Sequence, residues 1–255
     1  GLLGVNGPMP IHLTEYARDR ILHHRDLTLS RFLDLFNNRL TMLFYRSWAQ
    51  AQPAISLDRP DDSRFSKYLG TLFGAGGESS RNKDALPDYA KYFFAGHLSN
   101  PTKNAEGLSN WIRDYFRIEA QIKVYQAHWM KLPKSLMSRL GRNDTSSLGQ
   151  GAVLGSSVWD VQHRFRIRLG PLNWTQFRGF LPSERGMARL TAMVRNYAGL
   201  ELKWDVQICL LHREVPSLVL DQKTRAQQIG RLGRSCWLGI YRKAKDDEQL
   251  IVQLV

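Results

Sequence analysis

The chain has 255 residues, of which 43% are hydrophobic and 23% are charged, so it can bury a sizeable core without covalent staples. Its two cysteines, Cys209 and Cys236, exclude a disulfide framework and a cysteine-rich zinc module. A formal net charge of +13 predicts an acidic partner surface, whether nucleic acid, phospholipid or another protein.

The sequence gives no sign of insertion into a membrane or of a secretory signal. No apolar run reaches the ~20 residues that a membrane-spanning helix needs, and residues 1–10 lack the basic start of a signal peptide. The chain does not begin with methionine, so we expect residues to precede Gly1.

Residues 1–103 are predicted to be helical. Thr14 is expected to cap a short amphipathic helix, and a longer helix is predicted from about Ser30 to Gln50. Apolar residues recur there every three or four positions and therefore share one face. They are Phe32, Leu33, Phe36, Leu40, Leu43, Phe44 and Trp48. Such a stripe is typical of burial against neighbouring helices, and it also suits a helix shared with another subunit.

The rest of this helical region is predicted as shorter pieces. Residues 53–63 are expected to form a turn-rich connector, and a helix is predicted over 65–73, ended by the glycines of 74–77. Another helix is expected from Pro87 through Phe94, before a break at residues 99–101. Helices joined by short loops indicate a bundle.

The second half of the sequence repeats itself. The residues at 108, 111, 112, 113, 115 and 119 recur 82 positions later, with the same helical spacing of apolar positions. Each predicted helix leads into an alternating strand, over 118–124 and 200–208, and each strand ends near a proline, Pro133 or Pro216. A long loop follows in each case, and a final strand is expected over 161–169 and 249–255.

The predicted fold is therefore α+β: an N-terminal helical region followed by two copies of a helix–strand–long loop–strand unit. The predicted boundaries are 1–103, 104–182 and 183–255. The order of the strands stays open, since two such units can share one sheet or form two small ones.

A glycine-containing phrase closes both long loops. Leu148-Gly149…Val153-Leu154-Gly155 matches Leu232-Gly233…Trp237-Leu238-Gly239, 84 residues later. The first copy resembles a dinucleotide-binding loop, but its spacing has one residue too many and no helix is predicted after it. A backbone turn needed by both copies is the better interpretation.

No catalytic or metal-binding constellation is present in the sequence. The motifs GxxxxGK[ST], HExxH and GxSxG are absent, and none of the seven histidines has metal-ligand spacing with a second histidine or cysteine. We therefore predict that the protein is not an enzyme, binds no cofactor, metal or small-molecule substrate, and acts through contacts with other macromolecules.

The basic charge leaves nucleic-acid binding as the alternative function. Arg164, Arg166 and Arg168 alternate with apolar residues, so their guanidinium groups are expected to line one face of a strand. Stacking platforms for bases would require aromatic residues among them, and the aromatic residues lie mostly on stripes predicted to face inward. A solvated strand face, or contacts with protein carboxylates, explains the arginines equally well.

The two long loops, roughly 132–148 and 215–232, carry apolar residues beside basic ones. Loops of this length are uncommon in compact domains unless they are functional or disordered. Apolar residues with basic neighbours suit docking into an apolar pocket with an acidic rim, and a duplicated loop implies two equivalent docking events. The candidate contact residues are Leu132, Pro133, Leu136, Met137 and Leu140 in the first loop, and Val215, Pro216, Leu218, Val219, Leu220 and Ile229 in the second.

Several phrases of the sequence are similar to one known family. They are the opening residues 3–16 (LGVNGPMPIHLTEY), residues 31–36 (RFLDLF) with Arg39 and 43–48, Gly170-Pro171-Leu172, residues 177–182, and the phrase around Trp237-Leu238-Gly239. Together they span essentially the whole chain. The chain thereby resembles the TssG (ImpH) family of type VI secretion baseplate proteins.

This resemblance implies a structural adaptor in the baseplate wedge, similar to wedge proteins of contractile phage tails. Family members assemble with a pair of TssF copies, and the wedge recruits TssK trimers that link it to the membrane complex. The expected location is thus the cytoplasm, at a secretion complex anchored in the inner membrane, with other baseplate and sheath components as further contacts. We expect the two loops to dock two TssK trimers, and the helical region to pack against TssF through Phe32, Phe36, Leu40, Leu43, Phe44 and Trp48.

Overall fold

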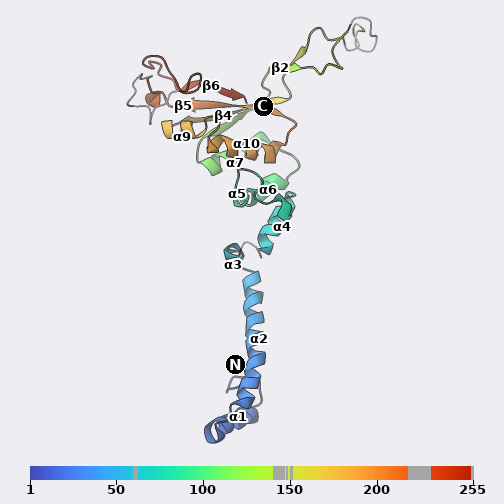
Figure 1. The fold of residues 1–255 in the computed structure, drawn as a ribbon, viewed down its shortest axis with the longest axis vertical. Helices are drawn as coiled ribbons and strands as arrows, with labels where there is room; N and C mark the ends of the chain where they lie inside the picture. The colour runs from blue at the N-terminus through green and yellow to red at the C-terminus, as the bar shows by residue number, and fades with distance from the viewer. Residues whose placement is uncertain (60–62, 140–146, 148, 150–151, 218–230, 254–255) are drawn as a thin grey trace. The chain divides into compact units, whose positions relative to one another are not determined.

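The computed structural model describes residues 1–59, 63–139, 147, 149, 152–217 and 231–253. It divides into two compact units, Gly1–Leu69 and Gly70–Val255, which are described separately (Figure 1). The distribution of contacts thus divides the helical region predicted over 1–103, and the boundary falls between Leu69 and Gly70. Its assignment as one partner-packing part stays a prediction.

The first unit is built around one long helix. Its elements are α1 (Ile11–His24), α2 (Thr28–Gln50), α3 (Pro53–Asp58) and the greater part of α4 (Arg64–Leu72). Asp26 links α1 to the start of α2, because its carboxylate accepts hydrogen bonds from the Thr28 hydroxyl and backbone N–H and from Arg20. These bonds, that of the Thr28 hydroxyl above all, lower the pKa of Asp26 to about 2.

Two local predictions in the first unit are wrong. Thr14 caps no helix, since α1 already begins at Ile11 and the Thr14 hydroxyl instead accepts a hydrogen bond from the Gly4 N–H. Within the connector predicted over 53–63, the first six residues form α3. Its first residue is Pro53, a position where the missing N–H costs no hydrogen bond and the fixed φ already suits a helix.

The second unit begins with short helices and continues as an α+β arrangement. Its helical elements are η2 (Glu78–Ser80), α5 (Asp88–Phe93), α6 (Ala95–Ser99), α7 (Ala105–Phe116), α9 (Trp174–Gly179), α10 (Arg185–Ala198) and η3 (His212–Glu214). Its strands are β1 (Ala120–Lys123), β2 (His128–Lys131), β3 (Ser157–Asp160), β4 (Arg164–Leu172), β5 (Lys203–Leu210) and β6 (Asp247–Gln253). The α+β prediction is confirmed.

Four strands form one sheet in the order β1-β4-β5-β6. β1 runs antiparallel to β4, β4 parallel to β5, and β5 antiparallel to β6. The two strands of each predicted repeat unit therefore pair with each other, and the units join through the parallel pair β4–β5. β2 and β3 form a separate antiparallel pair, which the sequence analysis did not predict.

The helices α7, α9 and α10 cover one face of the sheet, and the core lies between them and the strands (Figure 1). The repeated apolar positions on α7 and α10 all face this core: Leu108 and Leu190, Trp111 and Met193, Ile112 and Val194 are buried. Phe94 from the α5–α6 junction packs against Trp111, with ring centroids 5.6 Å apart. Residues following Leu69 therefore complete the core of the second unit.

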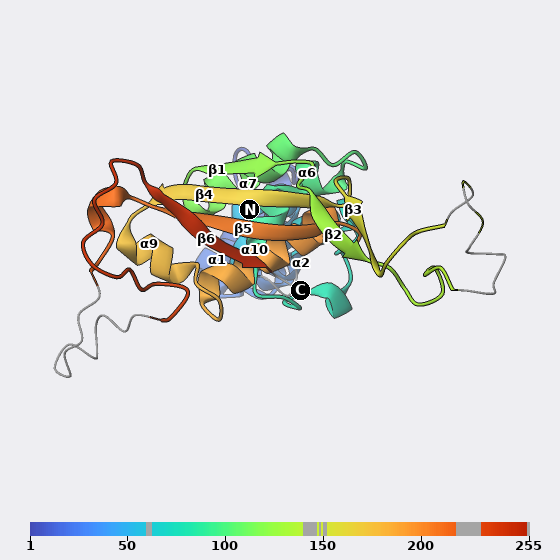
Figure 2. The ribbon, with the colours of Figure 1, turned by 90° about the horizontal axis from the view of Figure 1, so that it is seen from above.

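The segments that follow β1 and β5 leave the sheet at opposite ends, because these two strands run in opposite directions. Figure 2 shows the described part of the first loop, beyond β2, on one side of the sheet and that of the second on the other. The sheet thus holds the two predicted docking loops apart by the length of a strand, roughly 25 Å for eight residues.

Candidate assembly interface

The most exposed apolar surface of the first unit lies on α2. No residue of this 23-residue helix is buried. The six residues assigned to partner packing, which we call the wide face, have exposed fractions between 43% and 78%. They are Phe32, Phe36, Leu40, Leu43, Phe44 and Trp48. An apolar surface of this size without a covering element marks an interaction site.

The helix α2 has a second apolar side, which the sequence analysis missed. Leu35 and Met42 lie seven residues apart and are 70% and 56% exposed. At 3.6 residues per turn they share a side of the helix about 140° from the centre of the wide face. Arg39 and Arg46 lie on the shorter arc between the two. We call Leu35 and Met42 the narrow face. The seven-residue spacing could have revealed it in the sequence.

The predicted contact residues of the two loops differ in exposure. In the first loop, Leu136 and Pro133 are exposed, and Leu132 and Met137 are half-buried. In the second loop, Val215 and Pro216 are half-buried, and Val215 packs against the hydrophobic core. Leu140, Leu218, Val219, Leu220 and Ile229 lie outside the described residues. Their assignment to a partner stays a prediction.

Other exposed apolar side chains lie in or beside these loops, and the sequence analysis did not select them. Trp129 and Trp159 face each other across the β2–β3 pair, with ring centroids 5.2 Å apart, and both are exposed. Leu154 and Leu238, inside the repeated glycine phrase, are 97% and 94% exposed. A sequence pattern shows that these residues are apolar, but their exposure depends on which segments pack beside them.

The three arginines of β4 bind carboxylates on neighbouring strands. Arg164 and Arg166 both hold Asp205 on β5, with nitrogen–oxygen distances of 2.6 Å, and Arg168 pairs with Glu248 at the start of β6. The hydrogen bonds with Asp205 raise the pKa of Arg166. These guanidinium groups therefore stabilise the outer face of the sheet, and they no longer support the nucleic-acid alternative.

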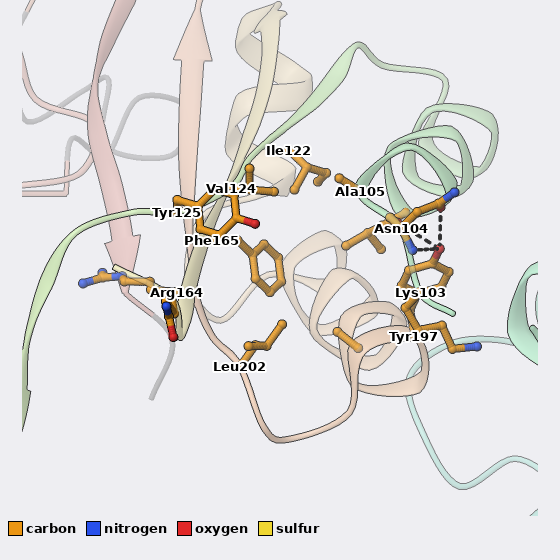
Figure 3. A pocket seen from close by; sticks show the side chains of 13 residues that line it. Lys103, Asn104, Ala105, Ile122, Val124, Tyr125, Arg164, Phe165, Tyr197 and Leu202 are labelled. Atoms are coloured by element: carbon orange, nitrogen blue, oxygen red, sulfur yellow. Dashed lines mark hydrogen bonds between the residues drawn. The ribbon is translucent and has the colours of Figure 1, made fainter. Parts of the chain in front are cut away.

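A small apolar pocket of about 260 Å³ lies beside the first turn of α7, the end of α10 and the edge of β1 (Figure 3). Its polar groups are already used by the fold. Asn104 caps α7 by accepting from the Gly107 N–H at 2.8 Å, and the Tyr197 hydroxyl bonds to the Asn104 side chain at 3.1 Å. The Lys103 ammonium donates to the carbonyl of Leu98 at 2.7 Å. No nucleophile–base pair lines this pocket.

Neither cysteine stands in a catalytic arrangement, and Cys209 is fully buried in β5. Burial raises the pKa of its thiol to about 11. At pH 8 only about one thiol in a thousand would be ionised, so we expect Cys209 to resist thiol reagents. Cys236 is half-buried in the segment before β6.

We expect dithionitrobenzoate at pH 8 to label one thiol of the native chain and two after denaturation in urea. The single labelled site should be lost in the variant Cys236→Ser and kept in Cys209→Ser. Rapid labelling of two thiols in the native chain would contradict the burial of Cys209.

Within the described ranges, no group of three or more histidine, cysteine, aspartate or glutamate side chains could hold a metal ion. In the same residues, no helix combines the length and the apolar character needed to cross a bilayer. The described chain exposes apolar side chains on α2 and in or beside the two loops, with basic residues next to them. These are the features of a subunit of a larger protein assembly.

The comparisons with known proteins agree with this class. The family model "Type VI secretion, TssG" matches residues 1–239, and the chain belongs to that family. No curated protein matches the chain.

Two solved structures share the fold. One, of a "type VI secretion system TssK-TssF-TssG baseplate subcomplex", has a chain with 21% identity and a TM-score of 0.68, covering 87% of this chain and 92% of that chain. The other, "the baseplate complex from the type VI secretion system", has a chain with 23% identity and a TM-score of 0.61, covering 99% of this chain and 71% of that chain.

Proposed function

We propose that this protein is a non-enzymatic structural adaptor of the type VI secretion baseplate wedge. In this proposal it packs against TssF through α2 and docks TssK trimers through its two loops. It acts in the cytoplasm, at a secretion complex anchored in the inner membrane. Family membership supports the role in type VI secretion, and the two solved structures are of assemblies of this kind.

The observation that carries this proposal is the uncovered helix α2. A helix with aromatic and aliphatic side chains exposed over most of its length is not stabilised by its own chain, because helices in water depend on packing of their apolar face. Burying the wide face in a partner would supply that packing. The narrow face offers a second contact, so one helix can lie between two copies of TssF.

The sheet supports the second half of the proposal. The two loops leave it at opposite ends, so two TssK trimers can be bound without occupying the same space (Figure 2). Each loop has apolar side chains next to basic ones, including Lys134 in the first loop, Lys131 just before it and Arg213 just before the second, all exposed. Apolar anchors with a basic rim suit an acidic partner surface.

Charged substitutions on the two faces of α2 test the TssF contact. We expect Phe36→Asp with Leu43→Asp, on the wide face, to lower the recovery of TssF with the tagged chain more than about tenfold, because charge is buried in an apolar interface. We expect Leu35→Asp with Met42→Asp to lower the number of TssF copies per chain from two to one. Native mass spectrometry of the co-expressed complex measures both.

The matched control carries the same added charge on the polar side of the same helix. Asn38→Asp with Thr41→Asp alters exposed positions outside both faces and should leave TssF binding unchanged. Circular dichroism of each complex checks that helix content is kept. Undiminished TssF binding by the wide-face variant would refute the assignment of α2.

A further inference from the structure

The repeated glycine phrase places an exposed leucine at the same position in both copies. Val153-Leu154-Gly155 and Trp237-Leu238-Gly239 lie 84 residues apart, and each places a leucine almost completely in solvent. We propose that Leu154 and Leu238 are twin anchors. Each inserts into an equivalent apolar pocket with an acidic rim, presented by one of two identical copies of a partner protein. This inference rests on the proposed docking function of the loops.

In each copy, the residue before the leucine is held against the protein. The backbone N–H of Val153 donates to the Ser138 hydroxyl at 3.0 Å, and the side chain of Val153 is half-buried. The indole N–H of Trp237 donates to the buried carboxylate of Asp247 at 2.9 Å. The leucine that follows each of these residues is exposed in both copies.

The backbone after each leucine also agrees between the copies. Gly155 has a φ of +99° and Gly239 a φ of +76°, and the earlier glycines of the phrase, Gly149 and Gly233, have +82° and +73°. No atom lies within 4 Å of where a Cβ would stand at any of the four. The glycines are therefore required by their positive φ and not by close packing. The positive φ is found at the equivalent glycines of both copies.

Exposure at matched positions indicates a shared function. A single exposed leucine on a protein surface needs no explanation. Here, however, two repeat-equivalent leucines in loops that otherwise differ are both exposed, and each is followed by a glycine of positive φ. Residues with equivalent surroundings are expected to bind equivalent surfaces. The two pockets therefore belong to identical copies of one protein, either protomers of a homo-oligomer or two identical subunits.

The charges around the leucines define the rim of the pocket. Residues 231–245 contain five cationic side chains and no acidic one. Four of the cations, at positions 234, 242, 243 and 245, are exposed and form no ion pair within the described residues, and Arg231 pairs with Glu184. Lys131 and Lys134 are exposed in the first loop, whose Leu132 N–H binds the Ser156 carbonyl beside the phrase. An acidic rim complements both sites.

The test measures TssK bound to the co-expressed complex of this chain with TssF. We expect Leu154→Ser or Leu238→Ser alone to halve the TssK trimers per wedge in native mass spectrometry. Both substitutions together should lower TssK binding more than about tenfold. The matched control is Leu200→Ser, which alters another exposed leucine next to a glycine of positive φ but lies outside the loops.

Loop replacements separate this inference from the proposed function. An Asn-Gly turn can replace residues 132–156, because Lys131 and Ser157 are paired in the β2–β3 ladder. A Gly-Ser segment of equal length can replace residues 218–230, together with Leu238→Ser, which keeps Ser235 and Trp237 in place. If the replacements remove TssK but the double leucine variant binds it normally, the anchors are refuted and loop docking stands. If TssK binds normally to both replacements, loop docking and the anchors are both refuted.

Discussion

Asp205→Ala is expected to lower the free energy of unfolding of the second unit by about 3–5 kcal/mol. The Asp205 carboxylate is completely buried in β5 and holds Arg164 and Arg166 of β4. Both arginine side chains are themselves largely buried, with exposed fractions of 16% and 23%. Removing the carboxylate leaves two guanidinium groups side by side without an acceptor, so the loss exceeds that of a surface ion pair.

Urea unfolding monitored by tryptophan fluorescence measures this loss. The matched control is Glu248→Ala, which removes the partner of Arg168 at a position where the glutamate side chain is 45% exposed. We expect that change to cost less than about 1 kcal/mol, as exposed ion pairs generally do. Equal losses for the two variants would show that burial of Asp205 contributes little.

The sequence predicts those helices in which regularly spaced apolar residues continue over a long stretch. The helix expected over 30–50 corresponds to α2, Thr28–Gln50, and the one over 65–73 to α4, Arg64–Leu72. Apolar residues at three- and four-residue spacing leave few alternatives when the stretch is long. The repeat was informative for the same reason, since its apolar positions on α7 and α10 all pack in or against the core, with Tyr115 partly buried and the others buried.

Short elements were harder to predict because their patterns contain few residues. β2 and β3 have four residues each and pair across 25 intervening positions, so neither strand shows a period on its own. The contact between Trp129 and Trp159 exists only once that register is set. α3 was mistaken for a connector because Pro53 and Pro60 bound a six-residue helix without a long apolar stripe.

The candidate interfaces are likewise predictable from the sequence only in part. The wide face of α2 follows from helical spacing, but its exposure does not, because the same stripe would suit a buried helix. For the β4 arginines the alternation of the sequence predicts the common face, while Asp205 becomes the partner of Arg164 and Arg166 only through the parallel pairing of β4 and β5. The proposal of Leu154 and Leu238 as anchors required both the repeat and their exposure in the structure.

Gly170→Ala is expected to be about as damaging as the loss of Asp205. Gly170 lies in β4 where the register with β5 shifts, and its φ is +106°. A Cβ there would stand 2.6 Å from the Cys209 carbonyl oxygen and 2.7 Å from the Leu172 nitrogen. Both are backbone atoms, so the two central strands must separate. Backbone strain of about 1–2 kcal/mol and overpacking of about 1–3 kcal/mol add to a loss of roughly 2–5 kcal/mol.

Gly96→Ala provides the matched control for this loss, because Gly96 lies in helix α6 with no atom within 4 Å of an added Cβ. Alanine there relieves the entropy cost of glycine, and we expect a gain of about 0.5–1 kcal/mol. Urea unfolding of both variants compares a glycine required by the backbone with one that is not. If Gly170→Ala unfolds at the urea concentration of the wild-type chain, the parallel β4–β5 pairing at this position is wrong.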